Sequence, residues 1–378
     1  MSTQEIYRQV SEAFIGAGGT PMQVTDTLIK IIRNIVNDDE TDFVLAFSEK
    51  NSQTMEQLVE TMALTEQVIE EKMTQMAAKG VIFNQPNRQG VIVYRLLPLV
   101  NVGVFEYTFM QKLERSAKNK ELADLFTQLF KEGKGLIQES YDEFIGMMGQ
   151  FPAVDRTVPV RINQSTGLST IIDINENLGQ PAETILQTKN VADLIEKFDE
   201  IAVGHCFCRH HKDMMDEPCK QTDIRESCFT FGKSARFTTE QGFMRMIDKK
   251  EALDILLKSE EDGLIHKAYH PNFNVSKDET SVCNCCKCCC GNSITNMIGP
   301  IINVANYLAE VDPEKCTGCE ICRDYCHTEA ITLNKDNVSE VDIERCLGCG
   351  ICAYFCPEDA IRLSENTRTV RIAPKREV

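Results

Sequence analysis

The chain of 378 residues contains no tryptophan, no cysteine before Cys206 and few positive charges, so that its net charge is −17. No apolar run reaches the roughly 18 residues that a membrane-spanning helix needs. The first residues lack the basic start and apolar stretch of a secretory signal. An excess of negative charge argues against a binding surface for nucleic acid or anionic lipid. These absences predict a cytoplasmic protein without a membrane span.

Nucleotide-binding motifs are also missing. The segment Gly16-Ala-Gly-Gly does not follow a strand, so it is not a dinucleotide fingerprint, and there is no Walker-type phosphate loop. Flavin, NAD and nucleoside triphosphates are therefore not expected as ligands. What is present is the composition of a globular protein, 42% hydrophobic and 26% charged, with length for two or three domains.

Cysteine is abundant and clustered. Of eighteen cysteines, ten lie between Cys206 and Cys290 and eight between Cys316 and Cys356. Thiols of a protein without a signal peptide stay reduced, so a disulfide framework is not expected. Clusters of thiols then indicate metal binding.

The last 70 residues contain a repeat, in which Val311–Cys326 realigns on Val341–Cys356 thirty residues further along. Each copy carries the spacing C-x₂-C-x₂-C-x₃-C. Gly318 and Gly348 let the loop backbone approach a bound cluster and direct N–H groups at sulfur. Zinc prefers two separated C-x₂-C pairs, so this spacing favours iron–sulfur clusters over zinc.

This segment resembles bacterial-type ferredoxin domains with two [4Fe–4S] clusters over about 60 residues. In that family the fourth cysteine of each motif ligates the other cluster. The resemblance therefore implies one cluster on Cys316, Cys319, Cys322 and Cys356, and a second on Cys346, Cys349, Cys352 and Cys326. It also implies a βαββαβ-like fold and one-electron transfer as the chemistry.

One position departs from the family. Pro357 follows the second motif as expected, but His327 stands where a proline would follow the first. We expect ligation to survive, because Cys326 is present. A histidine here could tune the potential of the neighbouring cluster or couple it to protons. The sequence favours an exposed bystander.

The ten upstream cysteines match no standard motif. They are Cys206, Cys208, Cys219, Cys228, Cys283, Cys285, Cys286, Cys288, Cys289 and Cys290. Three interpretations remain open: one or two further iron–sulfur clusters, structural zinc with Cys₄ or Cys₃His ligands (His205, His210 or His211), and an active-site cluster with an open position. The neighbouring ferredoxin motifs favour a further [4Fe–4S] cluster. A single cluster is not expected to use all six cysteines of 283–290, because adjacent side chains point in different directions.

The region also resembles a group of iron–sulfur binding proteins from anaerobes, in which a C-x-C-R-H segment and a C-x-C-C-x-C-C-C segment precede a ferredoxin pair. The resemblance covers residues 100–360 or so and implies a redox function without naming a substrate. Arg209, Lys212 and Arg225 are candidates to offset the charge of a thiolate-ligated cluster, or are simply solvated.

The N-terminal part reads as helical. Helices are expected within 1–40, then a short helix at Ser52–Met62, a second at Leu64–Lys79 and a two-stranded wing from Val81 to Tyr94. This order resembles a winged-helix domain at 40–98, with Val68, Ile69, Met73 and Met76 as the apolar face of the second helix. That helix carries Glu66, Glu70 and Glu71 against Lys72 and Lys79, which disfavours DNA reading.

Two amphipathic helices are expected within 103–150, short strands and one helix (Val191–Phe198) within 160–204, another helical stretch at 236–265, and a polar linker at Pro271–Thr280. The fold class is thus α+β with three domains: helical 1–150, Cys-rich α/β metal-binding 151–300, and ferredoxin 301–378. The sequence favours an electron-transfer protein of anaerobic metabolism that exchanges electrons with a redox partner protein. The alternatives are a reductase with its active site at the central cysteines, or a redox-sensing winged-helix regulator.

Overall fold

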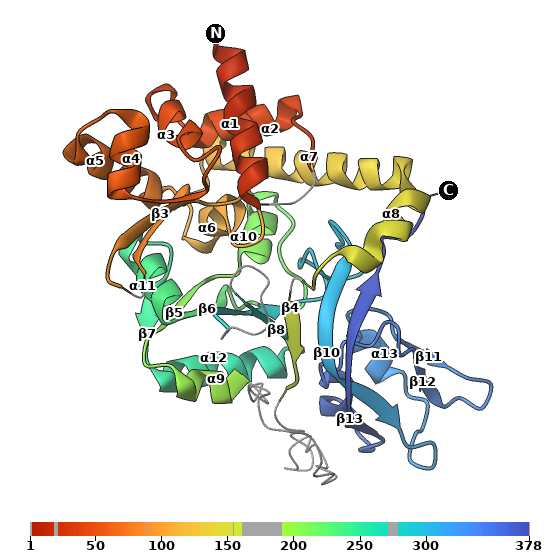
Figure 1. The fold of residues 1–378 in the computed structure, drawn as a ribbon. Coiled ribbons are helices and arrows are strands. Elements are labelled where there is room, and N and C mark those ends of the chain that lie inside the picture. The colour runs from red at the N-terminus through yellow and green to blue at the C-terminus, as the bar shows by residue number, and fades with distance from the viewer. Residues whose placement is uncertain are drawn as a thin grey trace, which may run out of the picture. The chain divides into compact units, whose positions relative to one another are not determined.

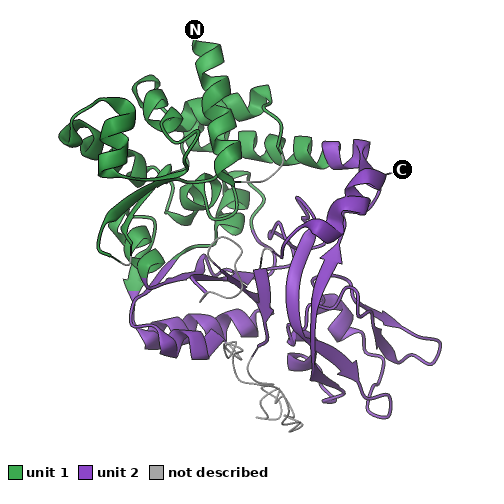
Figure 2. Ribbon diagram, viewed as in Figure 1, with its two compact units in different colours: residues 1–135, 204–218, 233–246 green, residues 136–203, 219–232, 247–378 purple. Residues whose placement is uncertain are grey.

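The computed structural model describes residues 2–18, 22–87, 89–153, 155–160, 191–270 and 279–377. Helices and strands are mixed throughout, which confirms the α+β class (Figure 1). The chain divides into two compact units that alternate along the sequence (Figure 2): unit 1 is 1–135, 204–218 and 233–246, and unit 2 is 136–203, 219–232 and 247–378. These boundaries do not fall at residues 150 and 300, and the three-domain division stays a prediction. Residues 161–190 and 271–278, to which strands and a linker were assigned, lie outside the described residues.

Unit 1 begins with helices whose apolar faces form one core. Thr25 caps α2 by accepting a hydrogen bond from the Leu28 N–H, and Leu28, Ile31 and Ile32 of that helix are fully buried. The elements before the first hairpin are α1 (Thr3–Gly18), α2 (Asp26–Ile35), the 3₁₀ turn η1 (Asp38–Glu40) and α3 (Thr41–Leu45).

Two helices and a hairpin follow in the predicted order. They are β1 (Ser52–Thr54), α4 (Met55–Met62), α5 (Glu66–Ala78), β2 (Ile82–Pro86) and β3 (Ile92–Leu96), with the strands in the order β1-β3-β2. Ile69, Met73 and Met76 of α5 are buried as expected, but Val68 is 47% exposed. Val68 was therefore wrongly assigned to the apolar face.

Residues 103–150 form three α-helices instead of two. They are α6 (Val104–Met110), α7 (Ala117–Glu139) and α8 (Tyr141–Met147), followed by the 3₁₀ turn η2 (Met148–Gln150). The expected helix at 236–265 is likewise divided into α11 (Lys233–Glu240), β7 (Arg245–Ile247) and α12 (Lys249–Glu261). Gly242 in left-handed conformation ends the first part, and Asp248 caps α12 through the Glu251 N–H.

The larger sheet has the strand order β13-β10-β4-β8-β9-β6-β5-β7, and the boundary between the units passes through β5 and β7. Its strands not yet named are β4 (Asp155–Val158), β5 (Ile201–His205), β6 (Glu226–Phe231), β8 (Ile265–Tyr269), β9 (Ser281–Cys285), β10 (Ile301–Val311) and β13 (Ile361–Ile372). The helix α9 (Val191–Lys197) falls where one was predicted, and its Leu194 and Ile195 are fully buried. In unit 1, α10 (Phe207–Met214) follows β5 directly.

Residues 301–372 form, in order, β10, α13 (Ile321–Tyr325), β11 (Ile331–Leu333), β12 (Ser339–Val341), α14 (Ile351–Tyr354) and β13. This is the predicted βαββαβ order, in which β10 pairs antiparallel with β13 and β11 with β12. The two copies of the repeat are bonded reciprocally: the Asp312 N–H donates to the Ala360 carbonyl and the Asp342 N–H to the Ala330 carbonyl, each at 2.7 Å. No described helix has the length and apolar character to cross a membrane.

Candidate iron–sulfur and metal sites

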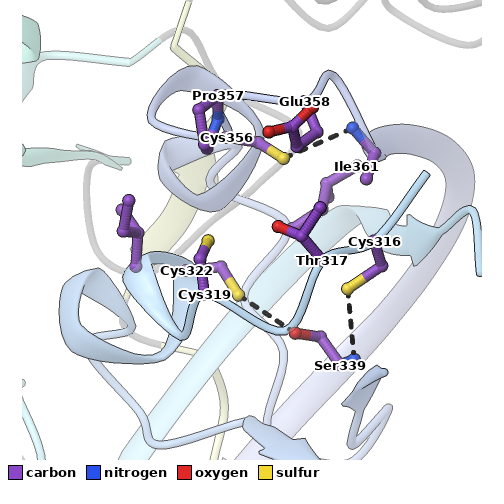
Figure 3. A pocket seen from close by; sticks show the side chains of 11 residues that line it. Cys316, Thr317, Cys319, Cys322, Ser339, Cys356, Pro357, Glu358 and Ile361 are labelled. Atoms are coloured by element: carbon purple, nitrogen blue, oxygen red, sulfur yellow. Dashed lines mark hydrogen bonds between the residues drawn. The ribbon is translucent and has the colours of Figure 1, made fainter. Parts of the chain in front are cut away.

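The first ferredoxin quartet gathers around one pocket. Cys316, Cys319 and Cys322 come from the first loop and the start of α13, and Cys356 comes from the end of the second motif (Figure 3). Ser339 of β12 closes one side, and its hydroxyl lies 3.4 Å from the Cys322 sulfur. Cys356 of the second motif thus lines the same pocket as three cysteines of the first motif, and the assignment of these four as ligands of one cluster stays a prediction.

The second ferredoxin quartet is more deeply buried. Cys349 lies close enough to Cys346 and to Cys326, the fourth cysteine of the first motif, for their charges to act on it. Burial raises the pKa of the Cys349 thiol to about 12, and burial likewise raises the pKa of Cys352 well above its usual value. A buried thiol with no cation to stabilise its thiolate stays protonated, and iron would supply the missing positive charge.

Backbone N–H groups point at the sulfurs in a repeated pattern. The Ala330 N–H donates to Cys326 Sγ at 3.2 Å, and the Ala360 N–H to Cys356 Sγ at 3.3 Å. The Ser339 N–H donates to Cys316 Sγ at 3.4 Å. Burial opposes ionisation of Cys316, but hydrogen bonds from the Ser339 and Gly318 N–H groups and from the Ser339 hydroxyl outweigh it and lower the pKa of its thiol. Such donors stabilise thiolate and set the potential of a bound cluster, so the residues present fit an iron–sulfur group.

The two loop glycines are required for a reason beyond cluster approach. Gly318 and Gly348 have φ of +67° and +65°. A Cβ atom at Gly318 would lie 2.3 Å from the Asn337 carbonyl oxygen, and one at Gly348 would lie 2.1 Å from the Tyr307 carbonyl oxygen. Any other residue would collide with backbone, so these loops can form only with glycine at both positions.

His327 is buried, at 2% exposed, which overturns the expectation of an exposed bystander. Its Nε2 lies 3.4 Å from the Gly263 carbonyl, its own carbonyl accepts from the Ile294 N–H, and its Nδ1 is buried without a hydrogen-bond partner among the described residues. The sequence did not reveal this burial, because the covering segments lie more than thirty residues away along the chain.

Four of the central cysteines form a compact group, which we call the tight quartet: Cys219, Cys286, Cys288 and Cys289. All four sulfurs lie within 4.8 Å of one another, with 3.5 Å between Cys219 and Cys288 and 3.6 Å between Cys288 and Cys289. Tetrahedral Zn²⁺ with Zn–S bonds of about 2.3 Å places its sulfurs about 3.8 Å apart. A cluster spreads its thiolates further, because each binds a different iron. The tight quartet therefore fits one tetrahedral ion.

Ionisation within the tight quartet is shared. Hydrogen bonding, first from Cys286, lowers the pKa of Cys219 to about 6. Contacts with Cys219 and Cys286 also lower the pKa of Cys288, whereas the contact with Cys219 raises that of Cys289. The contacts among these sulfurs therefore favour the thiolate at Cys219 and Cys288 and the thiol at Cys289.

The tight quartet corrects one sequence argument. Adjacent cysteines were expected to diverge, but Cys288 and Cys289 both point into the same group because the chain turns there. Outer contacts hold the turn: Gln221 accepts from the Lys287 N–H at 2.7 Å, and Asn296 donates to the Cys289 carbonyl at 2.8 Å. Among the described residues, the candidate ligands in this group are four cysteines and no histidine.

The remaining central cysteines lie elsewhere. Cys228 is on β6, Cys283 and Cys285 are on β9, and Cys290 follows the tight quartet, all in unit 2. Cys206, the N-cap of α10, and Cys208 in its first turn belong to unit 1. The structure therefore assigns these six to no single-ion group within the described residues.

Two of the histidines and two of the cations that the sequence offered have other partners. His210 Nδ1 lies 2.9 Å from the Phe109 carbonyl and His211 Nε2 lies 2.9 Å from the Ala123 carbonyl. Lys212 forms an exposed ion pair with Glu217, and Arg225 donates to the Thr222 carbonyl.

Sequence reasoning missed Lys267, which is fully buried on β8 and paired with Asp155 of β4 at 3.0 Å. The sequence feature that could have pointed to its burial is the position of this lysine within the strand-like segment Ile265–Tyr269.

Comparison with known proteins bears on the C-terminal part alone. No curated protein and no solved structure matches the chain. Residues 309–363 match a family model described as a 4Fe-4S dicluster domain, which spans both cysteine motifs and the reciprocal bonds between them. The chain therefore carries a ferredoxin-like iron–sulfur domain, of the 4Fe-4S dicluster family, at residues 309–363.

Proposed function

We propose that this protein is a cytoplasmic electron carrier of anaerobic metabolism, which relays single electrons between a partner oxidoreductase and a metal centre in its own Cys-rich region. The observation that carries the proposal is the exchange of fourth cysteines: Cys356 with the first loop and Cys326 with the second. Clusters bound there would supply one-electron chemistry. The chain's own part is to hold them close together and to direct N–H groups at their sulfurs.

The charge of the protein suits such a partner. With a net charge of −17, its surface would attract a basic patch on an oxidoreductase and raise the rate of association. Docking driven in this way weakens as ionic strength rises.

The regulator alternative finds little support in α5. Its exposed positions include Glu66, Glu70 and Glu71, while Lys72 pairs with Asp39 and Lys79 with Glu40, each at 2.7 Å. A helix whose cations are occupied and whose carboxylates face solvent repels phosphate. We infer that the winged-helix-like unit at 40–98 serves structure or protein docking.

The test is anaerobic purification with quantification of iron and acid-labile sulfide, before and after Cys356→Ser. The variant should lose about four irons per chain and the paramagnetic signal of one [4Fe–4S] cluster after dithionite reduction, because that cluster loses a ligand. Pro357→Ala, in the same loop but with every thiol kept, is the control and should retain every signal of the wild type. A colourless wild-type preparation without sulfide would refute the proposal.

Catalytic turnover distinguishes the reductase alternative from an electron carrier. An electron carrier should oxidise reduced viologen only to the extent of its own clusters. Continuous oxidation of reduced viologen with a small-molecule acceptor, lost in Cys219→Ser but kept in Pro357→Ala, would identify an enzyme with its active site at the central cysteines.

A further inference from the structure

Three central thiols outside the tight quartet share one face of the large sheet. Cys228 of β6 stands directly opposite Cys283 of β9 in antiparallel register, and their sulfurs are 4.0 Å apart. Side chains two residues apart on a strand point to the same side, so Cys285 lies on the face of Cys283. Asn284 between them points the other way and bonds to His266 and Ser227.

Cys290 completes the group. The Cys283 thiol lies within hydrogen-bonding reach of Cys228 and Cys285, and the Cys285 thiol within reach of Cys283 and Cys290. All four side chains are at most 7% exposed. We call Cys228, Cys283, Cys285 and Cys290 the open quartet. Each central quartet thus takes three cysteines from 283–290 and one from further upstream.

The two central quartets differ in geometry. Every sulfur of the tight quartet lies near every other, whereas those of the open quartet are linked in sequence, Cys228 to Cys283 to Cys285 to Cys290. Within the described ranges, only the tight quartet has all its sulfurs within 4.8 Å of one another. The ferredoxin quartets do not meet that limit either. Four thiols that meet only their neighbours in a row do not surround one tetrahedral ion, and a larger group with an iron for each sulfur would separate them further.

The surroundings of the open quartet suit a buried anionic group. Lys267 of β8 pairs with Cys283 in register, is fully buried, and lies close enough to Cys285 and Cys290 to interact with their charges. The Asn292 N–H donates to Cys290 Sγ at 3.4 Å. A buried negative charge without compensation costs free energy. Four thiolates around iron and sulfide would carry such a charge, and the Lys267 ammonium and the Asn292 N–H would offset it.

We propose that the open quartet holds a third [4Fe–4S] cluster, a centre separate from the single ion of the tight quartet. Its position suits the relay: His327, which adjoins Cys326 of the second ferredoxin quartet, lies close enough to Cys290 to interact with its charge. The use of this cluster in electron transfer rests on the proposed function, whereas the presence of the cluster is independent of it.

The experiment compares metal contents of full-length protein purified without oxygen. Wild type should contain about twelve irons and about one zinc per chain, from three cubane clusters and one Cys₄ ion. Cys285→Ser should lose about one third of the iron and keep the zinc. Cys219→Ser should lose the zinc and keep the iron. Mössbauer spectra of wild type should assign all the iron to [4Fe–4S] clusters and none to a single-iron site.

Matched controls separate ligand loss from misfolding. Asn284→Ala alters the same strand on its opposite face and should retain all the iron. Equal iron loss in Asn284→Ala and Cys285→Ser would overturn the assignment, as would about eight irons in wild type or zinc loss in Cys285→Ser. Failure of the proposed relay would appear differently, as a wild-type protein in which Cys285→Ser still removes iron but Cys356→Ser removes none.

Discussion

Tyr325 and Phe355 stack face to face, with ring centroids 3.9 Å apart and planes inclined by 4°. They occupy equivalent positions of the two repeats, each immediately before the fourth cysteine of its motif. Since Cys356 lines the pocket of the first loop and the charge of Cys326 acts on Cys349 of the second, this ring pair lies beside both fourth cysteines. It packs the two repeats against each other at that place.

Replacing either ring should loosen the crossing of the repeats. We expect Tyr325→Leu and Phe355→Leu each to speed the loss of cluster absorbance in guanidinium. Their coupling energy should be about 0.5–1.5 kcal/mol, the usual strength of an aromatic pair beyond its buried area. The measurement is a double-mutant cycle on anaerobic protein. Phe144→Leu, whose ring lies 6.1 Å from Phe151, serves as control. Strictly additive effects would show that the stack contributes no coupling.

Gln221 should determine how firmly the tight quartet binds its ion. Its Oε1 accepts from the Lys287 N–H, while its Nε2 donates to the Asp262 and Gly263 carbonyls, so it fixes the turn that carries three of the thiols. We expect Gln221→Ala to weaken zinc affinity by about 10–100-fold, as loss of an outer contact does. Competition with a chromophoric chelator measures this. Gln138→Ala, whose amide contacts the Lys375 carbonyl instead, should leave the affinity unchanged.

The ferredoxin part was largely predictable because its chemistry is local. The spacing of the cysteines within 316–326 and 346–356 predicts two cluster-binding loops. The shift of thirty residues between them shows that they are two copies of one repeat. The element order and the family match agree with that prediction.

The central cysteines were not predictable in the same way. Their partition depends on a turn after Cys285 and on strand register between β6 and β9, neither of which a run of cysteines reveals. Likewise, His327 is buried by Gly263 and Ile294, contacts that no local pattern encodes.

The buried pair of Lys267 and Asp155 should be costly to break. Asp155 is also bonded by Asn303, so the carboxylate is fully committed to partners within the sheet. Lys267→Met would leave it buried without its counter-charge, and we expect a loss of about 3–5 kcal/mol in the free energy of unfolding. Urea unfolding under anaerobic conditions measures this. Lys267→Arg keeps the charge and should lose less. A change below about 1 kcal/mol for the methionine variant would mean that the pair is solvated.

Unit 1 should lose stability in mild acid through His211. Burial lowers the pKa of this imidazole from 6.5 to about 4, although its hydrogen bond to the Ala123 carbonyl opposes the change. Lys212, Glu217 and Asp124 are the charges that act on it. The folded state therefore holds His211 neutral. Above pH 6.5 the contribution of neutral His211 to the free energy of unfolding is fully present. As the pH falls towards 4, His211 becomes protonated in the unfolded state but stays neutral in the folded state, so this contribution is lost.

His211→Asn keeps a hydrogen-bond donor without titrating, and so isolates this effect. At about 1.36 kcal/mol per unit of pKa, wild type should lose up to roughly 3 kcal/mol relative to the variant between pH 7 and pH 4. Thermal unfolding followed by helical circular dichroism at a series of pH values gives the difference. Other acid-sensitive groups, the cluster ligands included, act equally on both proteins, so they cancel. Parallel pH profiles would mean that His211 is solvated or already charged in the folded state.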